Sequence, residues 1–221
     1  MNSTLIQPLV RRRHAAIALF AAALACTVWA FIAHAQSKTA TATKLGGKAG
    51  ASDENSQLYR NPTFGFRYPI PYGWVDRTAE MQQGNDAGKA EVLLAVFERP
   101  PEASGDAVNS AVVIASESVA SYPGVKKAED YIGPVTELAT AQGFKADGDP
   151  YALEVESRQL VRADFVKTIT DKLTMHQCTL VLLAKHQIVS FTFIAGSDDE
   201  LDNLMDGLHF GAAKPPAHGR N

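Results

Sequence analysis

The stretch LTMHQCTLVLLAKHQIVSFTFIAGSDDELDNLMDGL, residues 173–208, decides the fold. It begins with two long apolar runs, residues 173–184 and 187–195, which flank Lys185-His186. In the second run, aromatic and β-branched side chains recur at every other position, which is typical of a strand with one buried face. Two such runs separated by two residues predict an antiparallel β-hairpin.

A helix is predicted directly after this hairpin. Ser197 is a preferred helix cap, and Glu200 stands at the third helical position, which together predict a capping box. Asp198 and Asp199 suit the positive end of the helix dipole. The apolar positions that follow have helical spacing and define one stripe: Leu201, Leu204, Met205 and Leu208.

Upstream of the hairpin, residues 90–97 and 111–119 are β-rich apolar runs typical of central strands, and residues 161–165 alternate between apolar and charged. Residues 126–142 instead carry apolar side chains at helical spacing. Pro134 lies inside that segment and is tolerated if the helix begins only a few residues earlier. Gly143 is a predicted helix stop. The sequence therefore predicts an α+β domain, an antiparallel sheet covered by two main helices.

The predicted domain opens with aromatic residues at alternate positions. Residues 64–68 predict a strand, residues 69–73 a break, and Trp74 the start of the next extended piece. The stretch YRNPTFGFRYP (59–69) followed by Gly73-Trp74 resembles the opening of PsbP-like domains. Residues 189–193, 197–201 and 208–210 resemble that family's last strand and helix.

The resemblance to PsbP-like domains implies an α/β/α sandwich around a central antiparallel sheet. The family includes extrinsic photosystem II subunits, a nuclear Ran-binding protein and many secreted bacterial members. It implies a protein that works by binding partners rather than by catalysis. The functional N-terminal portion of the photosystem subunits has no counterpart in residues 36–57, so no photosynthetic role and no binding residue is transferred.

The N-terminal segment reads as an export signal. Three arginines at 11–13 precede an apolar run, residues 15–33, and Ala33-His34-Ala35 fits a cleavage site. The run is long for a signal peptide and nearly long enough to span a bilayer, so a cleaved signal and a retained anchor both stay open. Either form places the rest of the chain outside the cytoplasm, as a periplasmic or secreted protein or one anchored to the inner membrane.

Cys26 lies in a loose lipobox, but the residues after it stay apolar, so we interpret it as a small helix residue. Residues 36–57 have the composition of a flexible linker, residues 58–210 form the predicted domain, and residues 211–221 are a predicted disordered tail. The net charge of -3 becomes -6 when the three arginines of residues 1–35 are removed. An acidic domain lacks the cationic surface that nucleic acid requires.

Candidate chemistry is sparse. His176 and Cys178 stand two apart in a predicted strand and so share a face, which is one hypothesis for a small enzyme with a thiol nucleophile. The alternative is a core cysteine beside a histidine at the rim. His176 and His186 could approach across the hairpin, but two ligands make a weak metal site, and we predict none. Asp147 and Asp149, on either side of Gly148, are interpreted as turn residues.

Tyr72 and Trp74 stand beside Pro71 and could form an aromatic ligand-binding shelf, although Trp74 could equally plug one end of the sheet. We therefore expect a non-catalytic extracytoplasmic binding or assembly module with an envelope protein partner and no cofactor. The alternative functions are a small-ligand carrier that uses Tyr72 and Trp74, and an enzyme that uses His176 and Cys178. Contact with a membrane is expected only through residues 15–33, if they are retained.

Overall fold

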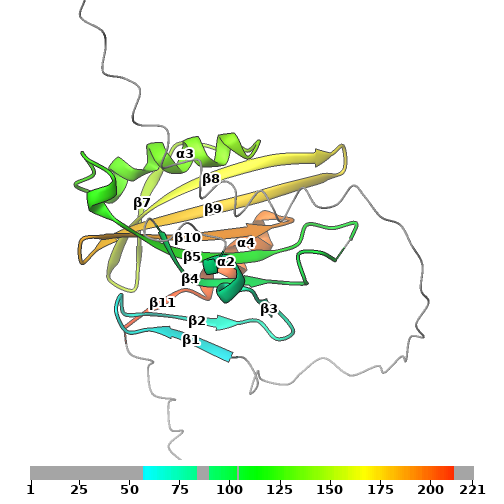
Figure 1. Ribbon diagram of the computed structural model, residues 1–221. Helices are drawn as coiled ribbons and strands as arrows, with labels where there is room; N and C mark the ends of the chain where they lie inside the picture. The colour runs from blue at the N-terminus through cyan, green and yellow to red at the C-terminus, as the bar shows by residue number, and fades with distance from the viewer. Residues whose placement is uncertain (1–56, 84–89, 104, 212–221) are drawn as a thin grey trace, which may run out of the picture.

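The computed structural model describes residues 57–83, 90–103 and 105–211. The predicted export segment, linker and tail lie outside these residues, apart from Gln57 and Gly211. A large antiparallel sheet dominates the described part (Figure 1). Its strands lie in the spatial order β3 (Val75–Asp76), β4 (Ala90–Phe97), β5 (Ala111–Ser118), β10 (Gln187–Ala195), β9 (Leu173–Ala184), β8 (Arg158–Thr170) and β6 (Lys145–Ala146). The short β7 (Tyr151–Val155) pairs with β8 as well.

A second, smaller sheet packs against one face of the large one. Its order is β1 (Gln57–Asn61), β2 (Phe66–Ile70) and β11 (His209–Phe210), so the two ends of the domain meet in it. Phe66 of β2 packs edge-on against Phe191 of β10, with ring centroids 5.1 Å apart. Tyr68 donates a hydrogen bond to the carbonyl of Leu204 at 3.0 Å. Helix α4 (Asp198–Asp206) therefore lies beside the small sheet on this face.

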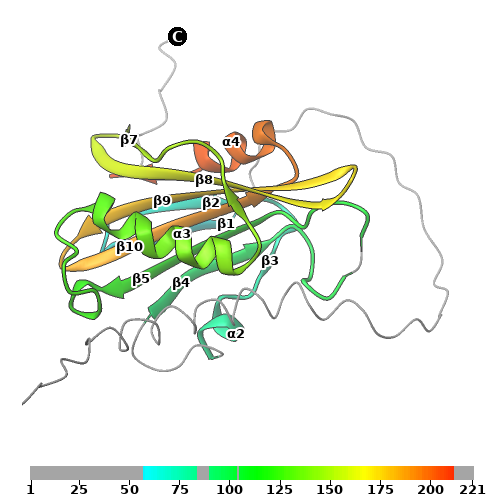
Figure 2. The same cartoon turned by 90° about the horizontal axis from the view of Figure 1, so that it is seen from above.

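The opposite face of the large sheet is covered by α3 (Ile132–Ala141), preceded by the 3-10 turns η1 (Val119–Ser121) and η2 (Ala128–Tyr131) (Figure 2). The short α2 (Thr78–Gln83) buries Met81 on this same face, over β4 and β5. The predicted α+β class and the antiparallel sandwich are confirmed. The two main helices are α3 and α4; among the described residues, α2 is a further short helix, and the small sheet forms part of the α4 layer.

The hairpin and its helix follow the sequence closely. β9 and β10 pair in register from Ala184 and Gln187 outward, and Lys185 and His186 both have positive φ, as a tight turn requires. Ser197 accepts a hydrogen bond from the amide of Glu200 at 3.3 Å. The predicted capping box is only half formed. The Glu200 carboxylate accepts from the Gly196 amide and from the Ser110 hydroxyl, at 3.1 and 2.6 Å, instead of from Ser197.

Pro134 lies in the first turn of α3, where the missing N–H has no helical partner to lose, and Gly143 with φ of 86° follows the helix as predicted. The strand predicted at residues 64–68 begins later and runs through Pro69, which was predicted to break it. Pro69 is tolerated because β11 pairs only with Phe66 and Arg67, so the β11 side of β2 is open at that point. No helix in the described ranges is both long and apolar enough to cross a bilayer.

Candidate functional site

A polar hollow of about 250 Å³ lies on the α4 side of the large sheet, near its β6–β8 edge. Strands β8 and β9 form its floor, the first turn of α4 one wall, and the turn after β6 another. The residues that line it are Asp147, Gly148, Arg162, Asp164, Phe165, His176, Gln177, Asp198 and Leu201. This combination of concave shape and convergent charged groups makes the hollow the candidate site.

Arg162 and Asp164 form the charged floor of the hollow. They stand two apart on β8 and so face the same side, with both carboxylate oxygens of Asp164 2.9 Å from Nε of Arg162. The Arg162 guanidinium also lies 3.6 Å from a carboxylate oxygen of Asp202 on α4 and 5.9 Å from the ring centre of Tyr151. The side chains of Arg162 and Asp164 are 18% and 21% exposed, so this pair is held largely out of water.

His176 joins the strands to the helix. Its Nδ1 lies 2.7 Å from a carboxylate oxygen of Asp198, the first residue of α4, and its side chain is 19% exposed. The Asp198 carboxylate is 77% exposed, so it faces both the imidazole and solvent. This contact orients the imidazole at the mouth of the hollow. It also ties the N-terminal end of α4 to β9.

Cys178 shares the face of His176, as its spacing predicted, but it lies beneath the surface. It is completely buried in the core cluster between the two sheets, opposite Asp164 in the strand register. Burial first, and then the nearby Asp164 carboxylate, raise the pKa of the Cys178 thiol. A protonated, inaccessible thiol is a poor nucleophile, because the thiolate is the reactive form.

Tyr72 and Trp74 lie elsewhere, in the turn between β2 and β3. The amide of Trp74 donates to the carbonyl of Pro71 at 3.2 Å, and Gly73 has the positive φ of 83° that this turn needs. The turn directs the two side chains differently: Tyr72 is 77% exposed, whereas Trp74 is half-buried against the main core cluster. Neither residue lines the polar hollow. Their role in ligand binding remains a prediction.

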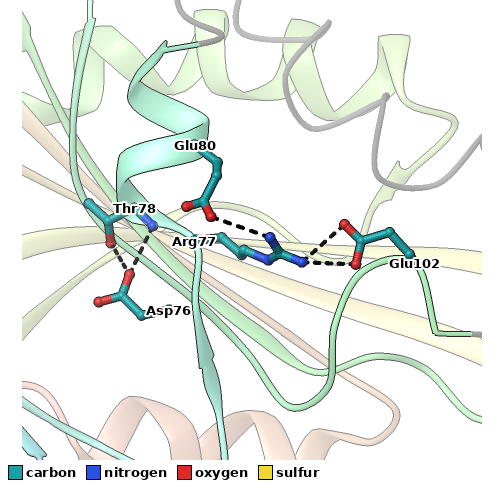
Figure 3. A network of polar contacts seen from close by, with 5 residues as sticks. All are labelled: Asp76, Arg77, Thr78, Glu80 and Glu102. Atoms are coloured by element: carbon teal, nitrogen blue, oxygen red, sulfur yellow. Dashed lines mark hydrogen bonds and ion pairs between the residues drawn. The ribbon is translucent and has the colours of Figure 1, made fainter.

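A polar network follows Trp74 along the chain and fastens α2 to the sheet (Figure 3). Asp76 caps the start of α2 by accepting from the amide and the hydroxyl of Thr78, at 2.8 and 2.6 Å. Arg77 forms a two-pronged ion pair with Glu102 and a further pair with Glu80 (Figure 3). The hydroxyl of Thr78 also accepts from the amide of Ala95 on β4. These contacts cap α2 and join it to β4.

The other histidines do not assemble a metal site. His186 lies in the β9–β10 turn. His176 lies eight residues, or roughly 27 Å, before the end of β9 at Ala184, so the two histidines do not approach across the hairpin. His209 contacts Glu156 at 3.2 Å. His14, His34 and His218 lie outside the described residues. Within the described ranges, no group of three acidic, histidine or cysteine side chains could hold a metal ion.

Comparison with known proteins adds three solved structures. Cyanobacterial PsbP from Synechocystis sp. PCC 6803 is similar at 14% identity, with a TM-score of 0.48 over 75% of this chain and 98% of that one. LpqN of Mycobacterium tuberculosis, described as involved in cell envelope biogenesis, has 16% identity and a TM-score of 0.37 over 72% and 94%. A Pseudomonas aeruginosa protein of unknown function has 18% identity and a TM-score of 0.34 over 68% and 89%.

No protein-family model and no curated protein matches the chain. PsbP, whose sequence pattern this chain resembles, is thus among the similar solved structures, and at these identities the likeness concerns the fold alone.

Sequence reasoning missed most of the hollow. Arg162 and Asp164 were recognised only as the wet face of a strand, and Asp147 only as a turn residue. The usable signal was the charged pair at i and i+2 on β8, which is unusual beside a strand as apolar as β9. Asp198 was interpreted only through the helix dipole. Its contact with His176 depends on how α4 docks.

Proposed function

We propose that this protein is a non-catalytic binding or assembly module held outside the cytoplasm. The export-type segment at residues 1–35 and the linker-like composition of residues 36–57 support the location. Retention of residues 15–33 would anchor the protein to the inner membrane, and their removal would release it to the periplasm or the exterior. The acidic balance of the remaining chain favours a protein partner over nucleic acid.

One observation carries the binding role: the hollow holds charged groups that contact one another. The thiol beneath the hollow, that of Cys178, is completely buried. Arg162 is hydrogen-bonded to Asp164, and His176 lies against the carboxylate of Asp198. Such pairing gives a rigid pattern of charge for recognition, because the groups need no reordering when a partner arrives. The burial of Cys178 weakens the alternative of an enzyme that uses His176 and Cys178.

The test is a crosslinked pull-down of the full-length protein from the envelope fraction of its native cell, read by mass spectrometry. A reproducible envelope protein, absent when an unrelated exported protein is the bait, is the expected result. The same run reports the N-terminus. A first peptide at Gln36 establishes cleavage, and peptides that span Ala33–Gln36 establish an anchor. Recovery of no protein above the control would contradict the module hypothesis.

A small-ligand carrier is the second candidate function, favoured by the contrast between Tyr72 and Trp74. The Tyr72 ring is 77% exposed and offers a surface on which a flat ligand can stack, two residues from the half-buried indole of Trp74. Because Trp29 also fluoresces, a Trp29→Phe variant isolates the signal of Trp74. Saturable quenching by a compound, lost on Tyr72→Ala, would support the carrier. Quenching that Tyr72→Ala leaves unchanged would argue against it.

A further inference from the structure

The polar hollow carries an excess of negative charge. Arg162 and His176 supply its positive groups among the described residues. Four carboxylates line the hollow or contact its arginine: Asp147, Asp164, Asp198 and Asp202. The N-terminal end of α4 adds the equivalent of roughly half a positive charge. Even with the imidazole protonated, the balance stays negative, so the hollow attracts cations and repels anions.

The acidic groups at the mouth of the hollow retain acceptor capacity. The Asp147 side chain makes no hydrogen bond or ion pair with the part of the chain that the structure describes, while its backbone amide is held by the carbonyl of Asp164 at 2.8 Å. Asp198 uses one oxygen for His176, and its carboxylate remains 77% exposed. An ionised carboxylate has about four acceptor positions. Both side chains can therefore accept from an incoming donor without breaking a contact within the protein.

The size of the hollow restricts what can enter. Pockets for small-molecule ligands span roughly 300–1,000 Å³, and this one has about 250 Å³. It suits one long side chain better than a cofactor. A bound metal ion is disfavoured as well, because the described acidic and histidine side chains here are not grouped as metal ligands.

We propose that the hollow binds the cationic end of an arginine or lysine side chain presented by the protein partner, an inference that rests on the proposed function. The guanidinium or ammonium group would enter between Asp147 and Asp198 and donate to both. Asp164 is already paired with Arg162, so the excess negative charge lies with Asp147, Asp198 and Asp202. Charge-assisted hydrogen bonds to carboxylates are stronger than those between neutral groups, and they discriminate by charge.

The direct test uses a defined probe with the full-length, ¹⁵N-labelled protein in a neutral detergent. N-acetyl-L-arginine amide is titrated while the amide signals of Gly148, Asp198 and Leu201 are followed by NMR. N-acetyl-L-citrulline amide, nearly the same shape without the charge, is the matched probe. We expect saturable shifts with the arginine probe that weaken from low to moderate salt, and none with the citrulline probe. Equal responses to both probes, or none to either, would overturn the proposal.

Variants locate the binding. Asp147→Asn combined with Asp198→Asn keeps the size of both side chains. It is expected to weaken binding of the arginine probe by about tenfold, since the charge of each exposed carboxylate contributes about threefold. Asp199→Asn is the control: it makes the same change in the same turn of α4, on an exposed residue that does not line the hollow. Its effect should stay within about twofold. Equal losses in the double variant and the control would refute binding in the hollow.

The pull-down separates this inference from the proposed function. A partner recovered by the wild type and lost by the Asp147→Asn/Asp198→Asn variant, but kept by Asp199→Asn, supports both. A partner kept by all three proteins leaves the module function standing and overturns the hollow as its contact. If no protein is recovered while the arginine probe binds with the expected specificity, the proposed function fails and the hollow remains a cation site.

Discussion

Replacing Glu156 by glutamine should loosen the junction between the two sheets. Glu156 lies in the β7–β8 turn, and its carboxylate accepts from the amide of Phe210 at 2.6 Å. It also contacts His209 at 3.2 Å and the Arg67 guanidinium at 4.0 Å, both in the small sheet. The hydrogen bond from the Phe210 amide, followed by the interaction with His209, lowers the pKa of Glu156.

The magnitude is modest, because the Glu156 side chain is 45% exposed and solvent screens its charge. A glutamine oxygen can still accept from the Phe210 amide, so the loss is that of a surface charge interaction, about 0.5–1 kcal/mol at pH 7. The pH dependence has a definite sign. A carboxyl group with a lowered native pKa stabilises the fold fully above its unfolded pKa, about 4.3. That contribution disappears as the pH falls through the lowered native pKa.

Urea unfolding of wild type and Glu156→Gln at pH 7 and at pH 3 measures both effects. We expect a lower midpoint for the variant at pH 7, with the slope unchanged, and a smaller difference between the two curves at pH 3. Glu154→Gln, the same change on the same hairpin, should change the free energy of unfolding by less than about 0.5 kcal/mol. Equal stability of Glu156→Gln and wild type at pH 7 would refute the role of Glu156, as would a gap at pH 3 as large as the gap at pH 7.

Three further predictions concern single sites. The Cys178 thiol should resist Ellman's reagent in the folded protein and react at the rate of unfolding, because it is completely buried; fast labelling of a Cys26→Ala protein would contradict this. Trp74→Ala should cost about 1–3 kcal/mol in urea unfolding, whereas Tyr72→Ala should leave stability within about 0.5 kcal/mol; equal losses would contradict the two environments. His186→Gly should stabilise the protein by about 1 kcal/mol, since His186 has a φ of 59°; a lower denaturation midpoint would count against a strained turn.

The parts of the fold that could be predicted are those with strong local patterns. The β9–β10 hairpin, the Ser197 cap and the tolerated Pro134 each depend on residues within a few positions of one another. The small sheet could not be predicted in the same way. β11 has only two residues, and its partner β2 lies about 140 positions earlier in the chain. A strand that short carries no periodicity, so only the folded core reveals it.

The hollow was hidden from the sequence for a related reason. That His176 and Cys178 share a face follows from strand alternation alone. The difference in their depth does not, because it depends on α4 and the small sheet covering one end of that face. The half-formed capping box shows the same limit. The Glu200 carboxylate accepts from the Ser110 hydroxyl, ninety positions away, and not from the Ser197 amide that the local motif predicts.

Stability alone does not account for the charged floor of the hollow. Arg162 and Asp164 are about four-fifths buried, and taking two charges out of water costs several kcal/mol per ion, which their attraction offsets only in part. Apolar residues at these positions would extend the cluster that contains Leu160, Cys178 and Leu180, a replacement that is often neutral for stability. What apolar residues could not supply is a fixed pair of opposite charges beside an open space. A partly buried ion pair contributes little net stability once its desolvation cost is counted, so its position beside the hollow favours the recognition role that we propose.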